Sequence, residues 1–113
     1  MFSDMMTMFG AISKGRPPKI ARDIAEVKDG YAVISTVNTY DQGPETALLS
    51  KVDAIILERY EDEAAALAGH AKWLGAVKDK VEVTDIGYGS IVGESVKKIE
   101  PYSLEEAQAE ARS

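Results

Sequence analysis

This sequence has no cysteine and only one histidine, His70, among its 113 residues. The lack of cysteine excludes disulfides, thiolate metal sites and cysteine nucleophiles, and a single histidine excludes a pair of imidazole ligands. No apolar run approaches the roughly 20 residues that a membrane-spanning helix needs, and the first residues do not follow the pattern of a secretion signal. We therefore expect a soluble intracellular protein with no membrane partner.

Positive charge is also scarce, with 13 Lys and Arg against 19 Asp and Glu and a net charge of −6. This balance argues against direct binding to nucleic acid, which needs a net basic face. The charge is uneven, because residues 1–22 hold four basic residues and one acid and carry +3, which leaves −9 for the other 91 residues. We interpret residues 15–22 as a basic, proline-containing connector. It is either an arm for phosphate or an acidic neighbour, or a linker that pairs with the acidic body of its own chain.

The composition is that of a folded protein, with 45% apolar and 28% charged residues, and the length fits a single domain over residues 1–113. Residues 1–14 place apolar side chains at helical spacing and predict a short amphipathic helix that serves as an arm or as core; these side chains are Phe2, Met5, Met6, Phe9 and Ile12. Residues 23–99 are expected to form the core, and residues 100–113 an acidic C-terminal helix or tail.

Within residues 23–99 the pattern predicts an α+β fold with a small antiparallel sheet of three to five strands. Asp29-Gly30 lies between two β-branched runs over residues 23–39, which predicts a hairpin. Residues 40–45 have turn chemistry, and residues 47–60 supply one long or two short strands. Residues 81–86 and 90–99 read as two more strands.

One main helix is expected at about residues 61–80, with three acids at its start. Its predicted sheet-facing stripe, with Trp73 at the margin, consists of Leu67, His70, Ala71, Leu74 and Val77. A second short helix follows Ser103-Leu-Glu-Glu106, which is a capping-box sequence.

A search for catalytic motifs finds none, so no catalytic, cofactor-binding or metal-binding residues are assigned. Gly87-Tyr-Gly89 through Gly93 lacks the spacing and context of a dinucleotide loop and is read as a turn. His70 is interpreted as a hydrogen-bonded core or interface histidine, with a cluster of Glu58, Arg59 and His70 as the alternative. A divalent cation at Asp41 and Glu45 also stays open as an alternative.

Residues 15–77 carry a series of short patterns in a definite order: Gly15-Arg16-Pro17, Ile20-Ala-Arg-Asp23, Val33-Ile-Ser-Thr-Val37, Asp41, Gly43-Pro44, Glu58-Arg59-Tyr60, Glu63-Ala64 and Ala68-Gly69-His70. In this order they resemble a family of small uncharacterised proteins of tailed bacteriophages and prophages. Gln42 stands where the family commonly has a histidine, which removes a second imidazole from the pattern. The resemblance implies a phage origin and a sheet-plus-helix core, and it brings no established activity.

Two functions are consistent with these features. The first is a non-enzymatic virion structural or assembly component that contacts other copies of itself or other phage proteins. The second is a host-directed inhibitor whose acidic body binds a bacterial defence or replication protein. The expected location is the virion or the host cytoplasm, and the candidate interaction residues are Phe2, Met5, Met6, Phe9, Arg16, Lys19 and Arg22.

Overall fold

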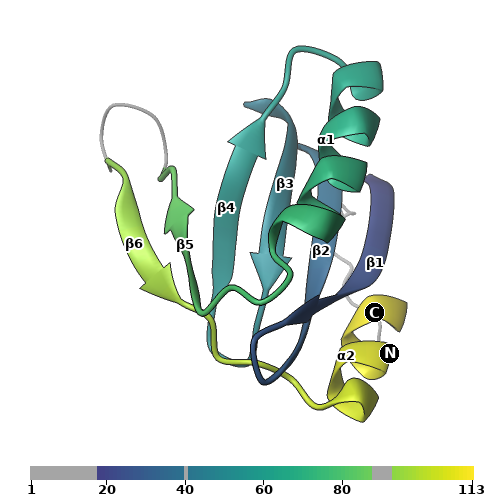
Figure 1. Cartoon of the computed structure of the whole chain (residues 1–113). Helices are drawn as coiled ribbons and strands as arrows, with labels where there is room; N and C mark the ends of the chain where they lie inside the picture. Colours follow the sequence, from purple (N-terminus) through teal and green to yellow (C-terminus); the bar gives the residue numbers. More distant parts are fainter. Residues whose placement is uncertain (1–17, 40, 88–92) are drawn as a thin grey trace.

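The computed structural model describes residues 18–39, 41–87 and 93–113, and the following account concerns these residues (Figure 1). Eight elements follow one another along the chain. They are β1 (Lys19–Val27), β2 (Gly30–Thr39), β3 (Gly43–Leu49), β4 (Ala54–Arg59), α1 (Glu63–Ala76), β5 (Glu82–Asp85), β6 (Ser95–Lys98) and α2 (Leu104–Arg112). The predicted α+β class, with a small antiparallel sheet and one main helix, is confirmed.

The main sheet is an antiparallel meander in the order β1-β2-β3-β4, and β5 and β6 form a separate antiparallel pair. The predicted hairpin at Asp29-Gly30 joins β1 to β2, with Asp29 at a φ of 66°. Gly30 is required by a close approach, because a Cβ there would lie 2.8 Å from both Pro101 Cβ and the Tyr102 carbonyl oxygen. That approach lets Tyr31 and Tyr102 exchange backbone hydrogen bonds of 3.0 and 2.8 Å.

Several expected boundaries shift in the structure. β1 begins at Lys19, so the second half of the expected connector, residues 19–22, belongs to the sheet. Residues 47–60 form two strands rather than one, and β3 begins within the expected turn. The main helix covers residues 63–76 instead of 61–80, because the chain turns after Val77 and Asp79 takes a φ of 63°.

The helix α1 lies on one face of the sheet (Figure 1), above a core drawn from β1 to β4. The buried members of this core are Ala25, Val27, Ala32, Ile34, Leu48, Ile55, Leu57, Val77 and Ile99, with Trp73, Leu74 and Val83 packed against them. The stripe predicted for α1 was partly wrong, since Leu67 is 48% exposed and Ala71 is exposed. His70, Leu74 and Val77 of that stripe do face the sheet, and Ala66 and Gly69 replace Leu67 and Ala71 as buried residues, with Tyr60 packed against Gly69.

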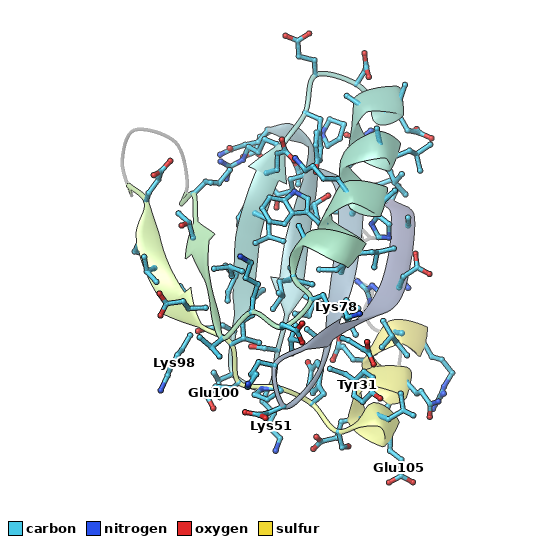
Figure 2. All side chains as sticks on the ribbon, in the orientation of Figure 1. Tyr31, Lys51, Lys78, Lys98, Glu100 and Glu105 are labelled. Carbon is cyan, nitrogen blue, oxygen red and sulfur yellow. The ribbon has the colours of Figure 1, made fainter. Side chains whose placement is uncertain are left out.

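The helix α2 packs against β1 and β2 and begins with the predicted capping box. Ser103 Oγ accepts from the Glu106 N–H at 3.1 Å, and the Glu106 carboxylate accepts from the Ser103 N–H at 2.8 Å. Figure 2 shows Tyr31, Lys51 and Glu100 at the same end of the molecule, where the chain runs from β6 to α2. There the Lys51 N–H donates to the Glu100 carbonyl oxygen at 3.0 Å, which fixes the chain before the helix.

Candidate functional site

His70 is the centre of a chain of polar side chains buried between α1 and the sheet. It lies on the inner side of α1, and only 6% of its side chain is exposed. Its Nε2 lies 2.8 Å from Asp23 Oδ2 on β1, and its Nδ1 lies 2.7 Å from Thr36 Oγ1 on β2. Asp23 is the solvent end of this chain, with 57% of its side chain exposed.

The chain continues through two hydroxyls that are fully buried. Thr36 Oγ1 lies 2.6 Å from Thr46 Oγ1 on β3, and the Tyr60 hydroxyl donates to Thr46 Oγ1 at 3.0 Å. When Asp23 Oδ2 accepts from His70 Nε2–H, the Nδ1 atom of the same neutral tautomer accepts from Thr36 Oγ1. The protons then run in one direction, from Tyr60 to Thr46, from Thr46 to Thr36, and from Thr36 to His70. We call these five residues the His70 relay.

A second polar group lies beside the Tyr60 end of the relay. Glu58 Oε1 accepts from Lys72 Nζ at 2.7 Å and from Trp73 Nε1 at 2.8 Å, and the Lys72 ammonium lies 5.1 Å from the centre of the Trp73 ring. Burial acts to raise the pKa of Glu58, but the hydrogen bonds from Lys72 and Trp73 outweigh it, so the pKa lies below its usual value. Burial raises the pKa of Tyr60 and so keeps its hydroxyl a donor.

The opposite face of the sheet holds an ion pair at the same end. Arg59 Nε lies 3.4 Å from Glu45 Oε1, and Arg59 Nη2 donates to the Gly87 carbonyl oxygen at 2.7 Å. Burial raises the pKa of Glu45, and the Arg59 guanidinium offsets only part of this effect. The pair therefore fixes the chain after β5 to β4.

The structure separates the three residues of the cluster considered from the sequence. Glu58 binds α1, Arg59 binds Glu45 on the other face, and His70 binds Asp23 and Thr36. The interpretation of His70 as a hydrogen-bonded buried histidine matches its position. Asp62 caps α1 and accepts from the Ala65 N–H at 2.8 Å, as its place before the helix suggests.

Two of the candidate interaction residues, Lys19 and Arg22, contact α2 of their own chain. Lys19 Nζ donates to the Ser113 carbonyl oxygen, and Arg22 donates to the Glu110 and Ser113 carbonyl oxygens at 3.4 and 3.0 Å. These contacts join residues of the expected connector to backbone carbonyl oxygens of their own chain. The other candidates, Phe2, Met5, Met6, Phe9 and Arg16, lie outside the described residues.

Sequence reasoning missed Asp23, Thr36, Thr46 and Tyr60 as partners of His70. A signal was present on β2, because Ala32, Ile34 and Thr36 alternate on the core face. A threonine on a buried face needs a hydrogen-bond partner. His70 was the other polar residue expected between the helix and the sheet, so it was a candidate partner for this threonine.

The relay offers little room for chemistry on a substrate. Thr36 and Thr46 are 0% exposed and His70 is 5% exposed, and their polar atoms form hydrogen bonds with one another. Over the described ranges there is no group of three or more His, Asp or Glu side chains placed to hold a metal ion. Across the same part of the chain, no helix is both long enough and apolar enough to cross a membrane.

Comparison with known proteins finds no match among protein-family models, among curated proteins or among solved structures.

Proposed function

We propose that this chain is a non-enzymatic bacteriophage protein that acts through contacts with other proteins, as a structural or assembly component of the virion. The observation that carries the proposal is the β5–β6 pair, which lies beside β4 as a separate two-stranded sheet (Figure 1) and exposes apolar side chains. Val96 on β6 is 63% exposed, and Val81 just before β5 is 52% exposed.

A two-stranded ribbon is marginally stable in water by itself. This one is held along β5, because the Ile86 N–H just after the strand donates to the Ile56 carbonyl oxygen at 2.9 Å and Val83 packs against the core. Its other face pairs Thr84 with Val96 and Glu82 with Lys98, all of them exposed. In the described structure β6 has no strand on its outer side, and such an edge is a template for a strand of another protein.

The burial of the His70 relay supports a role without catalysis. A general base has to reach a substrate proton at hydrogen-bond distance, directly or through one water. His70 instead uses both ring nitrogens within the fold. The relay is thus suited to hold α1 on the sheet.

The phage origin rests on the resemblance of residues 15–77. The alternative, a host-directed inhibitor, is supported by the net charge of −9 over residues 23–113. Lys51, Lys72 and Lys98 are exposed within that acidic body, which interrupts any continuous acidic surface. The virion function is therefore the one we propose, with the virion or the host cytoplasm as its location.

Quantitative mass spectrometry of purified particles of the encoding phage tests the proposal. We expect tens of copies or more per particle for the wild type. Val96→Glu should reduce incorporation by about tenfold or more, since it places a charge in an apolar contact. Val52→Glu is the matched control, because Val52 is 68% exposed and lies in the β3–β4 turn, outside the β5 and β6 strands.

Absence from particles together with strong early expression would favour the host-directed alternative. Equal incorporation of the Val96 and Val52 variants would remove the ribbon as the contact surface. Melting temperatures of the two purified variants close to that of the wild type show that any loss is not a loss of folding.

A further inference from the structure

The strand β1 forms one edge of the main sheet. It pairs with β2 alone in the order β1-β2-β3-β4, and Figure 1 shows it on the side of the sheet away from the β5–β6 pair. Over the described residues, no strand pairs with its other side. An edge strand presents the backbone N–H and C=O groups of alternate residues, and these groups form a template for a strand of another chain.

The backbone groups that β1 presents belong to Arg22, Ile24 and Glu26. Glu26 faces Tyr31 across the hairpin, but Tyr31 exchanges its backbone hydrogen bonds with Tyr102. Glu26 and Tyr31 are therefore a non-hydrogen-bonded pair, and the N–H and C=O groups of Glu26 point away from β2. The register continues without a shift from Glu26 to Arg22, so the groups of Ile24 and Arg22 point the same way.

The side chains of these three residues lie on the face of the sheet opposite α1. Asp23 points to α1, and strand side chains alternate between the two faces. Arg22 accordingly reaches Ser35 and α2 instead. Ile24 is half-buried and Glu26 is exposed, so both can meet a strand that lies along this edge.

We propose that β1 pairs with β1 of a second copy of this chain, antiparallel and about a two-fold axis that passes through Ile24. Such an axis sets Ile24 opposite Ile24 of the second copy, and it sets Arg22 opposite Glu26 at two symmetric places. Each facing pair would exchange two backbone hydrogen bonds, which would join the two four-stranded sheets into one. Apolar pairs and opposite charges that face one another across strands stabilise a sheet. The inference goes beyond the proposed function, because β1 and the β5–β6 pair lie at opposite edges of the main sheet.

Charge selects this register over its neighbours. An axis through Arg22 would set two arginines against each other, and an axis through Glu26 would set two glutamates against each other. An axis through Asp23 would place the Arg22 charge opposite Ile24. An axis through Ala25 would place the Glu26 charge opposite the same isoleucine. The charges that usually protect an edge strand from pairing therefore attract each other here in one register.

Two features bound the stretch that this pairing uses. After it, the Lys28 N–H donates to the Lys80 carbonyl oxygen at 3.1 Å, so the segment after α1 occupies the next position along the edge. Before it, the register with β2 shifts between Lys19 and Ala21. The contact is thus limited to one short strand pair over residues 22–26.

Disulfide cross-linking tests the register in the full chain, which has no cysteine of its own. In the proposed dimer the Cα atoms of the two copies of position 24 lie about 5.5 Å apart, within the range of a disulfide. The two copies of position 26 lie about 14 Å apart, which is too far. We expect Ile24→Cys to give at least about tenfold more covalent dimer than Glu26→Cys in a glutathione redox buffer.

Glu26→Cys is a stringent control, because Glu26 is the more exposed residue and random collisions would favour its cross-link. Equal cross-linking of the two variants, or more through position 26, would overturn the proposal.

Sedimentation equilibrium of charge variants supplies a second measurement. Glu26→Lys places a lysine opposite Arg22, and the axis repeats this change at a second place. We expect Glu26→Lys to dimerise about tenfold more weakly than the wild type. Asp53→Lys makes the same change of charge at an exposed position in the β3–β4 turn and should dimerise like the wild type. A wild type that stays monomeric at millimolar concentration, or equal association of the two variants, would overturn the proposal.

Val96→Glu separates this inference from the proposed function. We expect this variant to dimerise like the wild type, because Val96 lies on β6 and not on β1. Loss of dimers in Val96→Glu but not in Glu26→Lys would assign the contact between copies to the ribbon and overturn the pairing of β1. The particle measurements decide the proposed function whichever way β1 behaves.

Discussion

At the scale of single residues, Thr36 is held between two partners in the His70 relay. Its hydroxyl lies between His70 Nδ1 at 2.7 Å and Thr46 Oγ1 at 2.6 Å, and it is fully buried. When the imidazole proton lies on Nε2, the Thr36 and Thr46 hydroxyls each donate once and accept once. The threonines are therefore not simply small β-branched residues that fill space on the sheet.

Replacing Thr36 with valine tests the contribution of the relay. The valine has nearly the same shape, but it leaves His70 Nδ1 without a donor and Thr46 without an acceptor. We expect the free energy of unfolding to fall by about 1–3 kcal/mol in chemical denaturation. Thr84→Val on the exposed face of β5 should change it by less than about 0.5 kcal/mol. A Thr36 variant as stable as the wild type would mean that the relay provides no net stabilisation.

The lowered pKa of Glu58 predicts a dependence of stability on pH. A carboxyl whose pKa is lower in the folded state stabilises the fold above its usual pKa of about 4.5, and this stabilisation is lost as the pH falls through the folded-state pKa. Glu58→Gln should therefore be less stable than the wild type at pH 7, by no more than about 1 kcal/mol, because the carboxylate is partly exposed.

Melting temperatures between pH 7 and pH 3 measure this effect. The difference between the wild type and Glu58→Gln should shrink below pH 4.5. Glu94→Gln, at an exposed position outside the strands, is the control for the change in net charge. A difference that stays constant over this range would show that Glu58 acts by packing rather than by charge.

At the scale of elements, alanine substitutions at two glycines of α1 are expected to have opposite effects on stability. A Cβ on Gly69 would overlap the Tyr60 ring and hydroxyl, whereas a Cβ on Gly75 would meet no atom within 4 Å. Gly69→Ala should destabilise the protein by about 1–3 kcal/mol, because it pushes Tyr60 away from Thr46. Gly75→Ala should stabilise it by about 0.5–1 kcal/mol through helix propensity alone.

Thermal or chemical denaturation of the two alanine variants provides the measurement, and each variant is the other's control within one helix. Equal effects of the two substitutions would mean that the contact of α1 with Tyr60 is loose. Nuclear magnetic resonance of the Tyr60 hydroxyl or ring would then be expected to show a mobile side chain.

Local signals predicted most of the elements. Asp29-Gly30 located the first hairpin, and the capping box from Ser103 to Glu106 located the start of α2, because turn and cap chemistry depend on a few adjacent residues. The orientation of α1 could not be predicted, since it depends on the contact of Tyr60 with Gly69 across the β4–α1 connection. Its apolar residues lie on almost every side, so periodicity selected Leu67 and Ala71 wrongly.

The candidate site was less predictable than the fold. His70 was expected to be buried and hydrogen-bonded, but its partners are far away along the chain. Asp23 is 47 residues earlier and Thr36 is 34 residues earlier, and only the strand register brings them to one imidazole. The connector shows the same limit, because the contacts of Lys19 and Arg22 with α2 join residues about 90 positions apart.

At the scale of the whole molecule, the four-stranded meander stands in contrast to the C-terminal part. Each strand of the main sheet pairs with its neighbour in sequence, and α1 follows directly. The bridge between Tyr31 and Tyr102 and the contacts of α2 instead connect the two ends of the described chain. The fold thus has a locally connected body that α2 joins across a long sequence separation.

This order of connection has a consequence for biosynthesis. Structures built from short-range pairings form quickly, because little chain has to be searched before each contact is made. Residues 19–76 therefore already contain every strand of the main sheet and its covering helix while the last segment is still inside the ribosome. The main sheet and α1 can therefore form before α2 emerges, and α2 then binds Lys19 and Arg22 in a later, separate step.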